Sequence, residues 1–214
     1  LFDHIIEKNG LKITKIDCIE AEIERNISEN TKAVYIETPT NPMMNVYDIK
    51  RLAELTHAHG ALLIVDNTFL SPYFQNPLDL GADIVVHSGT KYLGGHNDTL
   101  SGFLVAGEGK IAEGLRFIIK TTGAGLAPFD SWLILRGIKT LGLRMEKAQE
   151  NAFEIARYLS EQKEVTKVLY PGLKEHPGYE IMKKQSRGFG GMVTFEVESE
   201  EFAKSILGNV KLIQ

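Results

Sequence analysis

The sequence has a single cysteine, Cys18, so it cannot form an intrachain disulfide. One cysteine in 214 residues is typical of a reducing compartment, and we therefore expect a cytoplasmic protein. No apolar run approaches the length of a membrane span, so a membrane is not expected as a partner. The net charge of -4 gives no basic footprint for binding nucleic acid.

The composition is that of a globular protein. Hydrophobic residues make up 43% of the chain and charged residues 24%, which is enough to form one or two domains with a buried core. The sequence begins at Leu1 instead of methionine and ends at Gln214 within a strand-like pattern. We therefore expect it to be part of a longer protein.

A lysine follows a buried strand near the middle of the chain. Residues 82–86 are apolar or β-branched apart from Asp83, which is typical of a buried strand. The small, polar run of Ser88, Gly89 and Thr90 then leads directly to Lys91. Lysine is rarely buried unless it is paired, so a lysine at the end of a buried strand indicates a reactive amine. The alternative is a solvated lysine at a strand end.

Two other strands end in polar side chains. Residues 62–65 form an apolar strand that ends in Asp66, and residues 33–36 form another that is followed by a proline-rich loop with Asn41. In open α/β sheets, ligands bind at the carboxyl ends of the strands. We therefore expect Asn41, Asp66 and Lys91 to meet at one edge of a sheet.

Strands and helices alternate along the first part of the chain, which favours a mostly parallel sheet with crossover helices. The spacing predicts strands over residues 11–16, 33–36, 62–65, 82–86 and 102–106, and helices over residues 19–27, 46–59 and 111–120. One long helical pattern then runs from residue 128 or 130 to residue 159, followed by strands over residues 165–170 and 191–197. We predict a large domain over residues 1–143, and a linking helix with an incomplete α+β domain over residues 144–214.

Short motifs in a fixed order carry a resemblance to a known family. They are Glu37-Thr38-Pro39, Asn41-Pro42, Asp66-Asn67-Thr68-Phe69, Ser71-Pro72, Gly81-Ala82-Asp83, His87-Ser88, Thr90-Lys91-Tyr92, Gly95-His96, Leu135-Arg136-Gly137, Lys139-Thr140-Leu141, Tyr170-Pro171-Gly172-Leu173 and Gly188-Phe189-Gly190-Gly191-Met192. The set resembles the Cys/Met-metabolism pyridoxal-phosphate (PLP) enzymes, which include cystathionine γ-synthases, cystathionine β- and γ-lyases and methionine γ-lyases. The resemblance covers nearly the whole sequence.

The resemblance implies an α/β fold of the fold-type I PLP-dependent transferase class, which is aspartate-aminotransferase-like with a seven-stranded, mostly parallel sheet. It also implies the site residues. Lys91 is expected to bind PLP covalently and then to move substrate protons, and Asp66 to keep the pyridine nitrogen protonated. Ser88 and Thr90 are expected to bind the cofactor phosphate, and Asn41 its phenolic oxygen or the substrate carboxylate.

Each of these residues also has a plainer interpretation. Asp66 can be a turn residue at a strand end, and Ser88 and Thr90 can be ordinary turn residues. Asn41 can form an Asx-type turn before Pro42. Only the co-occurrence of these residues with the family motifs favours the cofactor site.

The reaction implied by the resemblance is β- or γ-elimination on cystathionine or a related sulfur amino acid, which would release a thiol, a ketoacid and ammonia. The alternative within the family is a γ-replacement transferase, a cystathionine γ-synthase or O-acylhomoserine sulfhydrylase. A catalytically silent assembly protein that keeps the fold is a third possibility. The family also implies a homodimer or homotetramer whose subunits share active sites.

The resemblance places some family features outside this sequence. These are an upstream phosphate-binding loop, a tyrosine that stacks on the ring and a downstream arginine that binds the substrate carboxylate. We therefore expect the 214 residues alone to be inactive. Asn97 departs from the serine or glycine that is usual after the family histidine, which weakens any choice of subfamily.

Other candidate sites are weak. His57 and His59 do not share a helix face, so they do not form a zinc site with Glu54. Residues 188–191 and 89–91 match neither a dinucleotide fingerprint nor a nucleotide-binding P-loop. His96 can be catalytic or structural. Arg136, Lys139 and Arg144 are expected on a solvated or interhelical charged face.

Overall fold

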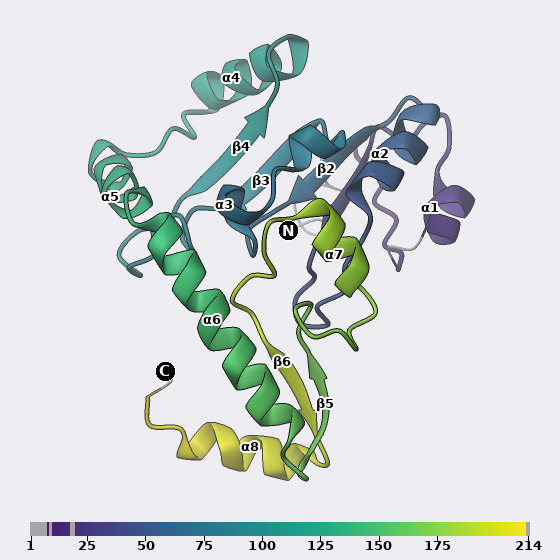
Figure 1. Ribbon diagram of the computed structural model, residues 1–214. Coiled ribbons are helices and arrows are strands. Elements are labelled where there is room, and N and C mark those ends of the chain that lie inside the picture. The colour runs from purple at the N-terminus through teal and green to yellow at the C-terminus, as the bar shows by residue number, and fades with distance from the viewer. Residues whose placement is uncertain (1–7, 9, 18–19, 213–214) are drawn as a thin grey trace.

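A four-stranded sheet occupies the upper part of the molecule in the view of Figure 1. The computed structural model describes residues 8, 10–17 and 20–212. Its strands β1 (Ala33–Glu37), β2 (Leu62–Asp66), β3 (Ile84–Ser88) and β4 (Gly102–Ala106) lie in this order across the sheet. β1, β2 and β3 run parallel, whereas β4 pairs antiparallel with β3. The sheet is mixed and mostly parallel, as predicted.

Helices connect the parallel strands, which confirms the predicted crossovers. α2 (Ile49–Ala58) leads from β1 to β2, and α3 (Ser71–Phe74) with the 3-10 helix Pro77–Leu80 leads from β2 to β3. Further helices are α1 (Glu20–Asn26), α4 (Lys110–Thr122), α5 (Pro128–Ile138), α6 (Leu141–Ser160), α7 (Tyr179–Gln185) and α8 (Glu200–Asn209).

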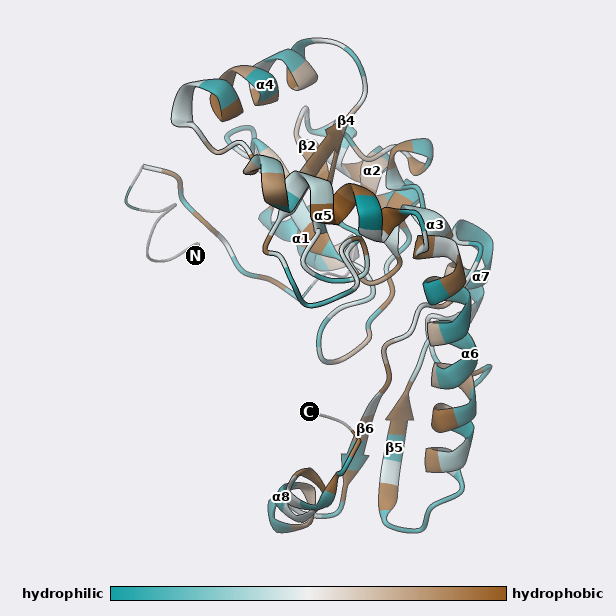
Figure 2. Ribbon diagram, turned by 90° about the vertical axis from the view of Figure 1, so that its left-hand side faces the viewer, coloured by the Kyte–Doolittle hydropathy of each residue, from teal (hydrophilic) through white to brown (hydrophobic). Residues whose placement is uncertain are grey.

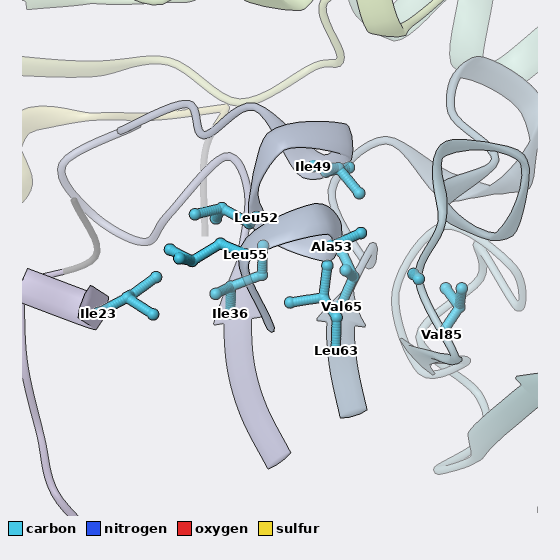
Figure 3. Packing of buried hydrophobic residues seen from close by; sticks show 10 residues of the cluster. Ile23, Ile36, Ile49, Leu52, Ala53, Leu55, Leu63, Val65 and Val85 are labelled. Carbon is cyan, nitrogen blue, oxygen red and sulfur yellow. The ribbon is translucent and has the colours of Figure 1, made fainter. Parts of the chain in front are cut away.

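One face of the sheet is buried against α2. Asp48 begins this helix by accepting a hydrogen bond from the backbone N–H of Arg51, which satisfies one of the open donors of the first turn. The apolar side of α2 then packs on alternate residues of the strands (Figure 3). The residues of this core are Ile23, Ile36, Ile49, Leu52, Ala53, Leu55, Leu63, Val65, Ala82 and Val85.

The strand residues between those core positions point to the opposite face, because side chains alternate along a strand. Tyr35 pairs with Ile64, and Glu37 pairs with Asp66, in the register of β1 and β2. Tyr35, Glu37 and Asp66 therefore share the face that α2 does not cover.

A second core joins the sheet to the long helix. It consists of Leu70, Phe74, Leu93, Leu141, Met145 and Met182, which come from the turn after β2, the loop after β3, α6 and α7. The loop that carries Lys91 is therefore attached through Leu93 to the start of α6.

A two-stranded sheet lies beside the lower part of α6 (Figure 1). β5 (Val165–Leu169) pairs antiparallel with β6 (Thr194–Val197), and Tyr170 packs against Ala152 and Ala156 of α6. This arrangement fits a second α+β unit. The division between residues 143 and 144 stays a prediction.

Several predicted elements differ in their bounds. The strand over residues 11–16 is wrong, because that segment has neither a helix nor a paired strand. β3 begins at Ile84, since the N–H of Ala82 instead bonds the carbonyl of Pro77 and closes the preceding turn. The single long helix is also wrong. A turn between the N–H of Thr140 and the carbonyl of Gly137 separates α5 from α6.

Two further predictions concern the single cysteine and membrane-spanning helices. Cys18 lies outside the described residues. Within the part of the chain that the structure describes, no helix is both long and apolar enough to cross a membrane.

Candidate active site

The carboxyl ends of the three parallel strands meet at one edge of the sheet. Glu37 at the end of β1 pairs with Asp66 at the end of β2, and Asp66 pairs with Val86 of β3. β3 continues to Ser88, and Lys91 follows three residues later. The strands therefore deliver the predicted carboxylate and the predicted amine to the same edge.

Asp66 is half-buried and held by hydrogen bonds on both carboxylate oxygens. Its Oδ1 accepts bonds from the backbone N–H of Thr68 at 3.0 Å and from the Thr68 hydroxyl at 2.6 Å. Its Oδ2 accepts a bond from the hydroxyl of Tyr35 at 3.0 Å. Three donors on one carboxylate fix its orientation.

Thr68 also connects Asp66 to Ser88. The Thr68 hydroxyl accepts a hydrogen bond of 2.9 Å from the backbone N–H of Ser88, so one side chain joins the ends of β2 and β3. Sequence analysis missed this role, although Thr68 stands two residues after Asp66, which is the spacing of an Asx-type turn.

Buried amides fix the turn that follows Asp66. Asn67 is fully buried, and its side-chain amide donates to the carbonyls of Ser71 and Gln75 at 3.1 and 2.8 Å. The Gln75 amide donates back to the Asn67 side-chain oxygen at 2.9 Å. Because buried polar groups are costly when unpaired, this pair specifies one conformation of the turn.

Glu37 brings a second carboxylate close to Asp66. Burial raises the pKa of Glu37, and the charge of Asp66 raises it further, whereas a hydrogen bond from the Asn41 backbone lowers it. The side chain of Asn41 itself is exposed. Asn41 is therefore linked to this edge through its backbone contact with Glu37.

Lys91 is held through its backbone. Its N–H bonds the carbonyl of Ser88 at 3.2 Å, and its own carbonyl accepts a bond of 2.8 Å from the N–H of Gly95. Gly89 permits the close approach of this loop to Ser101 and Phe103, because a Cβ there would collide with both. The Lys91 side chain is exposed, and among the described residues no hydrogen bond or ion pair joins it to another side chain.

Thr90 faces the start of β4. Its hydroxyl accepts a hydrogen bond from the N–H of Ser101 at 3.1 Å and lies 3.4 Å from the Ser101 carbonyl. Thr90 also lines a hollow of about 540 Å³ together with Asn97, Thr99, Leu100 and Asp130, which does not include Asp66 or Lys91. The Ser88 side chain is half-buried.

Arg144 ties the lysine loop to the junction of α5 and α6. Its guanidinium donates to the carbonyl of Tyr92 at 2.6 Å and to the carbonyl of Gly137 at 2.9 Å. Burial lowers the pKa of Arg144. A Cβ at Gly95 would collide with this guanidinium, and one at Gly137 would collide with the backbone of Gly94. Arg144 therefore lies where α6 meets α5 and the lysine loop, which is the interhelical alternative of the expectation.

The histidines have structural contacts. His57 bonds the carboxylate of Asp83 at 2.9 Å, and His96 bonds the carbonyl of Gly94 at 2.8 Å. Burial lowers the pKa of His87, which keeps this core side chain neutral. No group of His, Cys, Asp or Glu side chains suited to a metal ion occurs among the described residues.

The chemistry of this edge fits PLP. The cofactor needs an amine for its aldehyde, an ionised carboxylate for its protonated ring nitrogen, and hydroxyl or N–H donors for its phosphate. The edge offers an exposed amine at Lys91 and a carboxylate at Asp66 whose orientation three donors fix. Hydroxyls at Ser88 and Thr90 precede the amine.

Comparison with known proteins agrees with this chemistry. The family model for Cys/Met metabolism PLP-dependent enzymes matches residues 1–214. The chain is 50% identical to the cystathionine gamma-lyase of Bacillus subtilis (strain 168) over 209 residues, covering 97% of this chain and 55% of that protein. It is 47% identical to the cystathionine beta-lyase of Lactococcus lactis subsp. cremoris (strain MG1363) over 211 residues, covering 98% of this chain and 56% of that protein.

A solved structure confirms the predicted fold class. The crystal structure of cystathionine gamma-lyase from Lactobacillus plantarum complexed with L-serine matches with a TM-score of 0.90 and 44% identity, over 92% of this chain and 52% of that one. The chain spans about half the length of the curated relatives it matches. Because the family model matches every residue, the chain belongs to the Cys/Met metabolism PLP-dependent enzyme family.

Proposed function

We propose that the protein containing this chain is a PLP-dependent carbon–sulfur lyase of sulfur amino-acid metabolism. It performs β- or γ-elimination on cystathionine or a related thioether amino acid. The observation that carries this proposal is the fixed, triply hydrogen-bonded carboxylate of Asp66 at the same strand edge as the exposed amine of Lys91. The two lyases reported above add support.

In this proposal, five residues hold the cofactor. When PLP is bound and no substrate is present, Lys91 would hold its aldehyde carbon through Nζ with loss of water, Asp66 would pair with its ring nitrogen, Ser88 and Thr90 would donate to its phosphate, and Asn41 would contact its phenolic oxygen or the substrate carboxylate. When bound, PLP supplies a conjugated ring that accepts the electron pair left by the broken Cα–H bond.

The protein groups move and hold protons. Once the substrate amine has replaced it on the cofactor, the free amine of Lys91 would take the Cα proton of the substrate, and in γ-elimination it would release that proton before taking one from Cβ. The Lys91 side chain is exposed and its backbone is anchored by hydrogen bonds, which supports this mobile role. The Asp66 carboxylate would pair with the ring nitrogen and keep it protonated, which an amide in its place would not do.

A substrate panel tests the proposal. The protein containing this chain is incubated with cystathionine, with methionine, and with O-acylhomoserine plus cysteine, and ketoacid and thiol release are measured. We expect ketoacid from a thioether amino acid, loss of this activity in Lys91→Ala, and none of this loss in Lys163→Ala, which changes an exposed lysine. Ketoacid-free formation of cystathionine indicates the γ-replacement transferase instead, and no reaction with any substrate contradicts an enzyme.

We also propose a cytoplasmic homodimer or homotetramer with shared active sites. α4 and α5 carry exposed apolar side chains, and both ribbons have brown, hydrophobic stretches in Figure 2. These exposed apolar residues support self-association. Phe129 and Trp132 are 69% and 56% exposed, and their rings stack with centroids 5.9 Å apart. Light scattering tests this point, and a fully active monomer contradicts it. Trp132→Ser is expected to weaken assembly, whereas Leu207→Ser on α8 is the matched control.

A further inference from the structure

A tyrosine that belongs to none of the family motifs contacts the carboxylate of the proposed site. Tyr35 lies on β1, on the same sheet face as Asp66, and its hydroxyl donates a 3.0 Å hydrogen bond to Asp66 Oδ2. The two residues are 31 positions apart in the sequence and are brought together by the parallel register of β1 and β2.

We propose that Tyr35 is a positioning residue that orients the Asp66 carboxylate toward the ring nitrogen of PLP. This inference rests on the proposed function. Thr68 occupies Oδ1 with two donors, so without Tyr35 the carboxylate is held at one oxygen only. Tyr35 holds the second oxygen and thereby fixes the rotation of the carboxylate plane. An oxygen of a carboxylate carries two lone pairs, so Oδ2 retains one for a protonated ring nitrogen.

Tyr35 keeps the proton that this role needs. Burial raises the pKa of Tyr35, and the charge of Asp66 raises it further, so the phenol stays protonated and donates across the physiological pH range. Tyr35 can therefore donate its own proton in the hydrogen bond to Asp66 and does not take the proton of the ring nitrogen. Its side chain is 45% exposed, so its hydroxyl contact is not explained by burial in the core alone.

A purely structural role is the competing explanation, because the same hydrogen bond connects β1 to β2. The two explanations differ in whether the effect needs PLP. A positioning residue changes PLP binding and kcat, whereas a hydrogen bond that merely connects the strands lowers the unfolding free energy of the apoprotein, which urea unfolding measures.

The experiment combines Tyr35→Phe with Asp66→Ala in the protein containing this chain. Apoprotein is titrated with pyridoxal 5′-phosphate, and its dissociation constant is read from absorbance or fluorescence, together with kcat and KM of the loaded protein. Tyr158→Phe is the control, because it removes the hydroxyl of an exposed tyrosine on α6. Circular dichroism verifies that each variant is folded.

We expect Tyr35→Phe to raise the PLP dissociation constant about fivefold, the effect of one hydrogen bond of ~1 kcal/mol, and to lower kcat with little change in KM. We expect Tyr158→Phe to match the parent. In the Asp66→Ala background the Tyr35 effect should disappear. An unchanged dissociation constant in Tyr35→Phe, or an equal effect in both backgrounds, overturns the inference. A parent that does not bind PLP overturns the proposed function itself, which separates the two failures.

Discussion

The two chemical groups of the candidate site are held in different ways. Asp66 is fixed by side chains, because Thr68 and Tyr35 donate to both of its oxygens. Lys91 is fixed by backbone, because its N–H and carbonyl close turns with Ser88 and Gly95 while its side chain stays exposed. This difference fits the proposed roles. A carboxylate that pairs with the ring nitrogen has to keep one orientation, whereas an amine that moves protons needs a fixed backbone and a side chain that can rotate.

This contrast predicts different responses to mutation. On the acid side, each neighbour contributes one or two hydrogen bonds, so single changes should have graded effects. On the amine side, the reactive atom has no substitute, and the loop depends on packing that glycines and Arg144 make possible. The predictions below run from the largest expected effect, at Lys91, to the smallest, at Glu37.

The largest effect is expected at the amine. Lys91→Ala should abolish the visible absorbance of covalently bound PLP and lower turnover by about 10²–10⁴-fold, the range of a lost general acid–base group. Absorbance spectra and ketoacid release measure both effects in the protein containing this chain. Lys163→Ala should leave both unchanged. Retained absorbance in Lys91→Ala means that an amine other than that of Lys91 binds PLP.

The next effect is expected at the carboxylate. Asp66→Asn preserves the shape of the side chain but removes its charge, so the ring nitrogen loses the partner that keeps it protonated. We expect bound cofactor to remain detectable and turnover to fall by at least about 10²-fold. Activity equal to that of the parent contradicts the role of Asp66 and leaves Lys91 as the one group of the pair that the reaction needs.

A smaller effect is expected where the lysine loop meets α6. Arg144→Lys cannot reach the carbonyls of Tyr92 and Gly137 together, and hydrogen bonds from a charged donor contribute about 1.5–3 kcal/mol. We expect a loss of unfolding free energy of that order and weaker PLP binding, measured by urea unfolding and by titration. Arg157→Lys is the control, since Arg157 makes only an exposed 3.9 Å contact with Glu154. Equal losses in both variants show that the loop does not depend on Arg144.

Sequence reasoning named the two candidate groups but not what holds them. That Asp66 and Lys91 lie at one edge of the sheet was predictable, because each ends or follows an apolar strand and belongs to a distinctive motif. Tyr35 was missed because its contact depends on strand register, which neither the composition nor the spacing of β1 and β2 reveals. For Arg144 a solvated and an interhelical position were left open, because the helical pattern was treated as continuous through the turn at Gly137 and Thr140.

A still smaller effect is expected on the acid side. Thr68→Val keeps the backbone donor to Asp66 but removes the hydroxyl that joins Asp66 to Ser88. The loss of these two hydrogen bonds should cost about 1–2 kcal/mol of unfolding free energy, less than Arg144→Lys. Thr122→Val is the control, because its hydroxyl bonds an exposed helix carbonyl. A larger loss in Thr68→Val than in Arg144→Lys reverses the predicted order of the two sides.

The smallest effect is expected from Glu37, and it depends on pH. Burial, followed by the charge of Asp66, raises the pKa of Glu37 in the folded protein, so between the ordinary value of 4.5 and the raised one the folded state binds more protons than the unfolded state. Glu37 therefore contributes stability below about pH 4.5 that is lost as the pH rises through its raised pKa.

Glu37→Gln tests this sign, because the amide oxygen can still accept the Asn41 hydrogen bond but no longer titrates. Urea unfolding between about pH 4 and pH 8 should show a flatter decline of unfolding free energy for the variant than for the parent across that window. Glu164→Gln, at an exposed position, should follow the parent. If the unfolding free energy of Glu37→Gln declines as steeply with pH as that of the parent, titration of Glu37 does not cause the decline.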